Sequence, residues 1–321
     1  MSRQVLSVAS ECVPLIKSGG LADVTGALPG ALRQFGWHMR VMLPDYPGMA
    51  ERLSHPVDVK VWDDLFGGPA RLVLGRARDG FEVLVLSAPH LYDREGGPYL
   101  TPEGRDHPDN PERFAALCWA AMEVARDGLA DGWQPDLIHA HDWQGALAPV
   151  YLRQAAVPVP SVLSIHNIAF QGLAPVDRLA SLRLDPVGLN PGLLEFWGWI
   201  GALKAGLISA DRVATVSPRY ATELFLPEFG MGLEGVIAGL PRPVAGILNG
   251  IDLEAWNPAT DPKVTNFSAG TLAGRAENRR RLCSMFGLEP AQGPVLGVVS
   301  RLTGQKGLDL VPPLLPEFLA R

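Results

Sequence analysis

The segment from Phe81 to Ala140 reads FEVLVL at residues 81–86, ERFAALCWAAMEVAR at residues 112–126 and LIHA at residues 137–140. The first and last pieces are short runs of mostly apolar residues, which predicts strands covered on both faces. The middle piece has apolar residues at three- and four-residue spacing, which predicts a helix. Strand, helix and strand in this order favour an α/β fold built on a doubly wound, mostly parallel sheet.

The same alternation extends along most of the chain. An antiparallel strand pair is predicted within Lys60–Ala77, and the Gly-, Pro- and Asp-rich segment Asp93–Pro111 predicts a loop. Further strands are predicted at Val5–Ala9, Arg40–Leu43, Ser161–Ile165, Arg212–Val216, Ala245–Leu248 and Val295–Val299, and further helices at Glu195–Ile208 and Arg275–Phe286.

The predicted strands divide the chain into two domains. Residues 1–246 contain enough strands and helices for a complete sheet. Residues 247–321 contain a basic helix and the single strand Val295–Val299, and one strand cannot form a sheet by itself. We therefore expect a complete first domain over residues 1–246 and the beginning of a second over residues 247–321.

Composition limits the classes of protein to consider. The chain has 321 residues, 47% of them hydrophobic, and a formal net charge of −6. General binding to nucleic acid is not expected at this charge, and no apolar run is long enough to predict a membrane span. Three widely separated cysteines and an N-terminus without a signal-peptide pattern favour a cytoplasmic location.

A glycine-rich motif, KSGGLADV at residues 17–24, follows the first predicted strand and begins a helix. Glycines at a helix start let backbone amides approach an anion, and Lys17 adds a positive charge suited to a diphosphate. Asp23 lies one turn into the helix, where it can accept hydrogen bonds from sugar hydroxyls. The alternative is a glycine-rich turn with a solvated lysine, because many α/β folds begin in this way.

Polar residues follow two successive predicted strands. His139, His141 and Asp142 end one strand, and His166 and Asn167 end the next. Ligands of open α/β sheets bind at this edge. The histidine pair has no third metal ligand at a typical spacing, so a hydrogen-bonding sugar pocket is favoured over a metal site. A purely structural His–Asp pair is the remaining alternative.

Two further motifs lie near and beyond the predicted domain boundary. Asn249 and Gly250 follow a strand, where they indicate either a ligand contact or a simple turn. Arg301 and Lys306 follow the last predicted strand, in the run SRLTGQKG at residues 300–307. An arginine and a lysine on such a loop can bind a departing diphosphate, whereas an ordinary basic loop is the alternative.

Taken together, these motifs resemble those of bacterial glycogen synthases and plant-type starch synthases, which are two-domain glycosyltransferases of the GT-B fold. The resemblance covers essentially the whole chain, and the motifs occur in the family's order. They are KSGGLADV, HAHDWQ, SIHNIAFQG, LEFWGWIGALKAGL, ATVSPRYA, EFGMGLEGV, ILNGID and VSRLTGQKGLDL.

The resemblance implies transfer of glucose from ADP-glucose to the non-reducing end of an α-1,4-glucan, with retention of anomeric configuration and with no metal or cofactor. It implies three sets of site residues. Asp142, His166, Arg301 and Lys306 are implied to be catalytic; Lys17, Gly19, Gly20, Asp23 and Asn249 to bind ADP-glucose; and Glu11, Tyr99 and His141 to bind the acceptor.

The resemblance also implies that family members continue beyond Arg321 with a glutamate-containing donor segment. We therefore expect the 321-residue chain by itself to be inactive or nearly so. The donor preference for ADP-glucose over UDP-glucose depends mostly on residues outside the chain. The alternatives are a protein that binds glucan without transferring sugar and a nucleotide-binding oxidoreductase, although the latter lacks a G-x-G-x-x-G pattern after Ala9.

Overall fold

The computed structural model describes residues 3–77, 80–289, 293–300, 302 and 304–320. The chain divides into two units, Met1–Gly250 and Ile251–Arg321. The boundary predicted from the sequence, after Gly246, lies four residues earlier.

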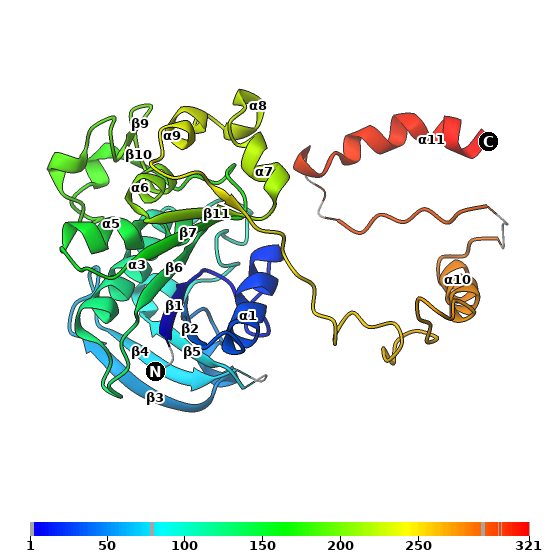
Figure 1. Cartoon of the computed structure of the whole chain (residues 1–321), viewed down its shortest axis with the longest axis horizontal. Coiled ribbons are helices and arrows are strands. Elements are labelled where there is room, and N and C mark those ends of the chain that lie inside the picture. Colours follow the sequence, from blue (N-terminus) through cyan, green and yellow to red (C-terminus); the bar gives the residue numbers. More distant parts are fainter. Residues whose placement is uncertain (1–2, 78–79, 290–292, 301, 303, 321) are drawn as a thin grey trace. The chain divides into compact units, whose positions relative to one another are not determined.

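The first unit is built on a nine-stranded sheet among the residues that the structure describes (Figure 1). The strands from β12 to β5 are parallel to their neighbours, whereas β4 and β3 are antiparallel. In spatial order they are β12 (Ala245–Gly246), β11 (Arg212–Thr215), β7 (Ser161–Ile165), β6 (Leu137–His141), β1 (Arg3–Val8), β2 (Trp37–Pro44), β5 (Glu82–Ser87), β4 (Ala70–Arg76) and β3 (Ser54–Trp62).

Helices cover both faces of this sheet, and Figure 1 shows α1 on one side and α3 with α5 on the other. The α-helices of the first unit are α1 (Gly20–Arg33), α2 (Pro89–Tyr92), α3 (Asn110–Asp127), α4 (Asp142–Gly145), α5 (Leu147–Gln154), α6 (Ala202–Ser209), α7 (Pro218–Glu223), α8 (Pro227–Gly230) and α9 (Glu234–Ala238). Short 3-10 helices are η1 (Ala50–Arg52), η2 (Val176–Arg178) and η3 (Pro186–Gly188).

The central strands are apolar on successive residues because both of their faces are buried. In β5, Leu84 and Leu86 pack into the core beneath α3 and α5, whereas Val83 and Val85 pack into the core on the opposite face. All four are 0% exposed. Full burial of one such side chain contributes about 1.5–3 kcal/mol, so this pattern specifies a strand inside a two-sided sheet.

A second, smaller sheet follows β7 and has three antiparallel strands within the described residues. Its strands are β8 (Leu173–Pro175), β9 (Glu195–Phe196) and β10 (Trp199–Gly201), with β10 in the middle. The helix predicted over Glu195–Ile208 was therefore wrong in its first half. Gly198 at φ +84° and Gly201 disfavour a helix there, and the helix α6 begins only at Ala202.

The second unit contains α10 (Gly274–Met285), η4 (Gly304–Lys306), η5 (Leu308–Leu310) and α11 (Val311–Ala320). The strand predicted at Val295–Val299 is not formed. A strand needs a hydrogen-bonding neighbour, and no described residue pairs with this segment, whose Val299 side chain is fully exposed. No helix of the described chain is long and apolar enough to cross a membrane.

The sheet predictions are otherwise confirmed with small shifts at the ends. The strand pair expected within Lys60–Ala77 is β3 and β4, and the helix expected at Glu112–Arg126 lies within α3. Between β5 and α3, Asp93–Asp109 is a loop apart from bridge pairing at Leu100 and Asp106.

Strand order brings three carboxyl strand ends together. In the sheet, β1 lies between β6 and β2. The strands that follow β1 in sequence, β2 to β5, lie on one side of it, and the later strands β6, β7, β11 and β12 lie on the other. Such a reversal leaves a crevice beyond the carboxyl ends of the strands. The segments after β1, β6 and β7 therefore meet at one edge, which is where the predicted polar motifs lie.

We predict that Gly145→Ala lowers the free energy of unfolding by about 1–3 kcal/mol. A Cβ at Gly145 lies 2.9 Å from the carbonyl oxygen of Val8 and 3.2 Å from Cα of Ala140, so it meets backbone atoms of two central strands. Urea unfolding measures the effect. The matched control is Gly235→Ala in α9, where a Cβ meets no atom within 4 Å and is expected to raise stability by about 0.4–1 kcal/mol. Equal effects of the two substitutions would contradict this packing argument.

Candidate functional site

Glu11 lies just beyond β1 with 3% of its surface exposed. Its carboxylate accepts hydrogen bonds from the Ser18 amide, the Ser18 hydroxyl at 2.7 Å and the Gly19 amide at 3.1 Å. The hydroxyl of Tyr99 also donates to it. Glu11 therefore connects the β1 loop, the start of α1 and the loop Asp93–Asp109, with three of its bonds reaching the start of α1.

Asp142 lies at the corresponding position beyond β6 and is 9% exposed. Its Oδ1 accepts hydrogen bonds from the His166 amide at 2.7 Å and the Asn167 amide at 3.2 Å, which connects the ends of β6 and β7. Burial raises the pKa of Asp142 to about 7, and the nearby negative charge of Glu11 adds to this effect. The backbone of Asp142 is also left-handed, with φ +50°, a conformation often found at functional sites.

Three histidines lie side by side at the same edge. The ring centroids of His139 and His141 are 4.2 Å apart, and those of His141 and His166 are 5.3 Å apart. His141 bonds His166 through Nδ1 at 3.0 Å and the Ser7 hydroxyl through Nε2 at 3.1 Å. Burial lowers the pKa of His139 and of His166 to about 4, and that of His141 well below its usual value. All three rings are therefore neutral near pH 7, and His166 retains partial exposure.

The loop that carries Tyr99 is held by a buried arginine. Arg113, in α3, is 0% exposed and donates to the carbonyl oxygens of Leu91 at 2.8 Å and Pro98 at 3.0 Å, and to Asn110 Oδ1 at 2.6 Å. Asn110 in turn donates to the Tyr99 carbonyl oxygen at 2.9 Å. The bonds of Arg113 thus go to the backbone and an amide, and they fix the position from which Tyr99 reaches Glu11.

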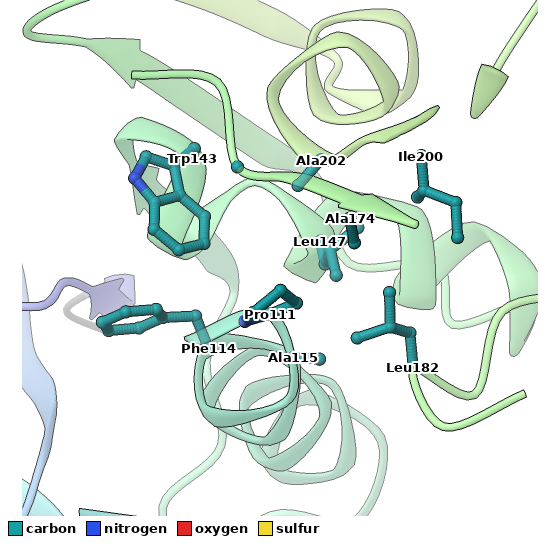
Figure 2. Close-up of a pocket in the computed structure, with 10 residues that line it drawn as sticks. Pro111, Phe114, Ala115, Trp143, Leu147, Ala174, Leu182, Ile200 and Ala202 are labelled. Carbon is teal, nitrogen blue, oxygen red and sulfur yellow. The ribbon is translucent and has the colours of Figure 1, made fainter. Parts of the chain in front are cut away.

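Trp143, the residue after Asp142, lines two cavities. The smaller is an apolar cavity of about 10 Å³, and Figure 2 shows Trp143 near Phe114 at one side of it. The two rings are edge-to-face with centroids 5.0 Å apart. Gly172, with φ +63°, passes so close that a Cβ would lie 2.3 Å from the indole. The indole is thus held between Phe114 and the backbone at Gly172.

The larger cavity is an open pocket of about 590 Å³ on the surface beside Trp143. We call it the Trp143 pocket. Polar and aromatic groups are mixed in its wall, as expected of a site for a polar organic ligand. It is lined by Asp106, His107, Pro108, Asn110, Pro111, Trp143, Ala169, Phe170, Gln171, Gly172, Leu173, Pro175 and Arg178.

The predicted acceptor residues and two of the predicted catalytic residues are brought together. Glu11 bonds Tyr99, His141 bonds His166, and Asp142 bonds the His166 backbone. Ser7, Ser164 and Arg113 were missed by the sequence analysis. A signal existed for the serines, because Ser7 and Ser164 each stand between apolar residues of a strand. Their hydroxyls bond His141 and His139.

Of the predicted donor residues, Gly19 contacts the same site through its amide, which donates to Glu11, whereas Lys17, Asp23 and Asn249 are exposed. Lys17 forms an ion pair with both carboxylate oxygens of Asp23, at 2.6 and 2.7 Å, and both side chains are about half exposed. A Cβ placed on Gly19 or Gly20 meets no atom within 4 Å, so the start of α1 is open to approach. Asn249 is exposed beyond β12. Of the two remaining predicted catalytic residues, Lys306 is exposed in η4 of the second unit. Arg301 lies outside the described residues.

The described residues contain no group of three or more His, Cys, Asp or Glu side chains arranged to hold a metal ion.

The chain is similar in sequence to known glycogen and starch synthases. Residues 4–239 match the family described as starch synthase catalytic domain. The chain is 53% identical over 318 residues to a glycogen synthase of Cereibacter sphaeroides and 54% identical over 320 residues to one of Paracoccus denitrificans. It covers 66% of the length of each, while 99% and 98% of the chain itself is matched.

Among solved structures, the catalytic domain of starch synthase IV from Arabidopsis thaliana, bound to ADP and acarbose, matches with a TM-score of 0.83 and 30% identity. The match covers 100% of this chain and 67% of that one. The chain therefore shares the GT-B fold of that catalytic domain over the part that it spans.

We predict that Arg113→Met loosens the loop Asp93–Asp109. The substitution removes three hydrogen bonds from a charged donor, each of which contributes about 1.5–3 kcal/mol, and Tyr99 then loses its fixed position. Limited trypsin digestion measures the effect, with cleavage after Arg105 expected to accelerate about tenfold or more. Arg153→Met, at an exposed position of α5, is the control. Unchanged cleavage after Arg105 would refute the positioning role of Arg113.

We also predict a pH-dependent stabilisation by Asp142→Asn. Because the pKa of Asp142 is raised to about 7 in the folded chain, the folded state holds a proton that the unfolded state has released between about pH 4 and 7. Stability from this residue therefore falls as pH rises, by at most about 1.4 kcal/mol per pH unit. Asparagine tolerates the left-handed backbone and can accept the same two amide bonds.

The measurement is urea unfolding of both chains across this pH range. The stability difference in favour of the asparagine variant should grow toward pH 7, while the histidines contribute to both chains alike. A difference that does not change with pH would show that Asp142 ionises at its ordinary pKa.

Proposed function

Because the chain belongs to the family of starch synthase catalytic domains, we propose that it forms the acceptor-side part of a glycogen synthase. The reaction is transfer of glucose from ADP-glucose to the non-reducing end of an α-1,4-glucan with retention of configuration. The 53% identity to the Cereibacter glycogen synthase supports this assignment. The reaction is a proposal for the longer protein, because the chain spans 66% of that relative.

The observation that carries the proposal is the pair of buried carboxylates at the carboxyl ends of β1 and β6. Glu11 and Asp142 are bonded by backbone amides, a serine and a tyrosine, and among the described residues no cation forms an ion pair with either. The site is therefore electronegative. Glycosyl transfer passes through a transition state with positive charge on the sugar ring, which such an arrangement stabilises.

Acceptor binding follows from the neighbouring groups. Asp142, next in sequence to Trp143, and the neutral His166 lie at the carboxyl ends of β6 and β7, where we expect them to bond sugar hydroxyls. Tyr99 and His141 hold Glu11 and His166 in place. In the transfer step the bond from glucose C1 to the β-phosphate oxygen breaks and a bond from C1 to the acceptor O4 forms. The hydroxyl proton leaves with the departing ADP.

Donor binding requires cations near the diphosphate. The Lys17–Asp23 pair is exposed, and such pairs contribute only about 0–1 kcal/mol, so Lys17 can exchange Asp23 for a phosphate at little cost. A Cβ at Gly19 or Gly20 meets no atom within 4 Å, which leaves room for that phosphate beside the Ser18 and Gly19 amides that donate to Glu11. Asp23 and Asn249 then contact the glucose, and Arg301 with Lys306 stabilise the negative charge of the departing diphosphate. ADP-glucose is a substrate here, and we propose neither a metal nor a cofactor.

We predict that glucose transfer appears when the chain is joined to the remaining third of the Cereibacter glycogen synthase, and that the chain alone gives little or none. Incorporation of radiolabelled glucose from ADP-glucose into glycogen measures this activity. In the fusion, Asp142→Asn should lower kcat by about 100-fold or more, whereas Arg153→Met serves as the matched control.

A folded fusion that binds glycogen but transfers no glucose would contradict the proposed function. Transfer by the unextended chain at the rate of the fusion would contradict its assignment as the acceptor-side part alone.

A further inference from the structure

The small sheet β8–β10–β9 has one buried face and one exposed face. Ala174 and Ile200 are each 1% exposed and pack toward the core. Leu173 and Trp199, adjacent to them in the strands, are 44% and 46% exposed. Because side chains alternate along a strand, Leu173, Pro175 and Trp199 share the outer face, which is exposed over β8 and β10. Phe196, the register partner of Trp199 on β9, is 9% exposed.

The turn between β9 and β10 departs from the usual preferences at one residue. Trp197 has φ +54° and is followed by Gly198 at φ +84°, with Phe196 paired to Trp199 across the turn. Two-residue turns of this kind prefer Asn-Gly, because both central residues need positive φ. A bulky tryptophan at the first position is strained, and its side chain is 79% exposed. A strained and exposed aromatic residue indicates a functional position rather than a folding requirement.

The outer face is continuous with the Trp143 pocket. Phe170, Leu173 and Pro175 line that pocket, and Phe170 is 55% exposed. Trp199 is the register partner of Pro175, so it lies directly beside the pocket wall. Trp197 follows at the adjoining turn. Exposed apolar and aromatic side chains therefore extend from the wall of the Trp143 pocket to the tip of the hairpin.

From this geometry, and resting on the proposed function, we propose that Trp197 and Trp199 bind a glucan chain that extends out of the Trp143 pocket. The flat apolar indole matches the apolar C–H face of a glucose ring, and its N–H can bond a hydroxyl at the ring edge. The occupant is thus the part of the acceptor that lies beyond the sugars at the reacting end.

Charge and area favour this occupant over others. Lys204, in α6, is 6% exposed and donates to the carbonyl oxygens of Pro191 and Glu195. Arg178, in the wall of the Trp143 pocket, forms an ion pair with Glu112, so neither cation offers an unpaired charge to a ligand. A neutral polymer is therefore favoured over an anionic one. The strands contribute three, two and three residues, far fewer than the roughly 20–30 residues a side of a stable protein interface, which disfavours a second copy of the chain.

The test measures binding of the unmodified 321-residue chain and its variants to glycogen by affinity electrophoresis without any donor. Trp197→Asn replaces the strained residue by the one that the turn prefers, so the variant should be at least as stable as the parent while its dissociation constant for glycogen rises about tenfold. Trp199→Thr keeps a strand-forming residue and should weaken binding similarly. Phe35→Ala removes an exposed aromatic side chain between α1 and β2, at the amino ends of the parallel strands. This variant should leave binding within about twofold.

The outcomes separate this assignment from the proposed function. Glycogen binding by all four chains with equal affinity would overturn the role of the tryptophans and leave the proposed function standing. Failure of the parent chain to bind glycogen would contradict both. A parent chain that forms dimers in sedimentation, and loses them on Trp197→Asn, would overturn the assignment by showing that a second copy covers this face.

Discussion

Two carboxylates, Glu11 and Asp142, are buried beside the reversal of strand order, and backbone amides rather than cations compensate them among the described residues. Burying a charge without a counter-ion is costly, so the surrounding chain has to supply donors at fixed positions. Glu11 takes them from the start of α1 and from Tyr99. Asp142 takes them from the amides after β7. These hydrogen bonds hold together the ends of β1, β6 and β7 and the loop after β5.

The electrostatics of the site follow from the same constraint. Burial holds Asp142 close to its point of ionisation near neutral pH and keeps the three histidines uncharged. The result is an edge rich in hydrogen-bonding groups, at which no cation of the described residues forms an ion pair with Glu11 or Asp142. In the proposed reaction the cations belong to the donor side, where negative charge accumulates on the leaving diphosphate, and the carboxylates face the sugar ring, where positive charge develops.

Most of the sheet could be predicted from the sequence because burial on both faces leaves a continuous apolar run, as in Leu84–Leu86. The clustering of His141, Asp142 and His166 followed from the rule that carboxyl strand ends meet. The β9–β10 hairpin was missed because its apolar spacing imitates a helix and only Gly198 reveals the turn. Val295–Val299 was predicted as a strand on composition, but a strand depends on a partner that lies elsewhere in sequence. Arg113 was missed because its role depends on carbonyl groups, which carry no signature in the sequence.

The central claim is that the edge formed by the ends of β1, β6 and β7 binds the end of a glucan acceptor. A crystal structure of the chain with maltoheptaose tests this claim most directly. The account predicts a glucan whose non-reducing end contacts Asp142 and His166 and whose next sugars lie in the Trp143 pocket. A glucan bound at another face, with Asp142 and His166 free of sugar, would contradict it.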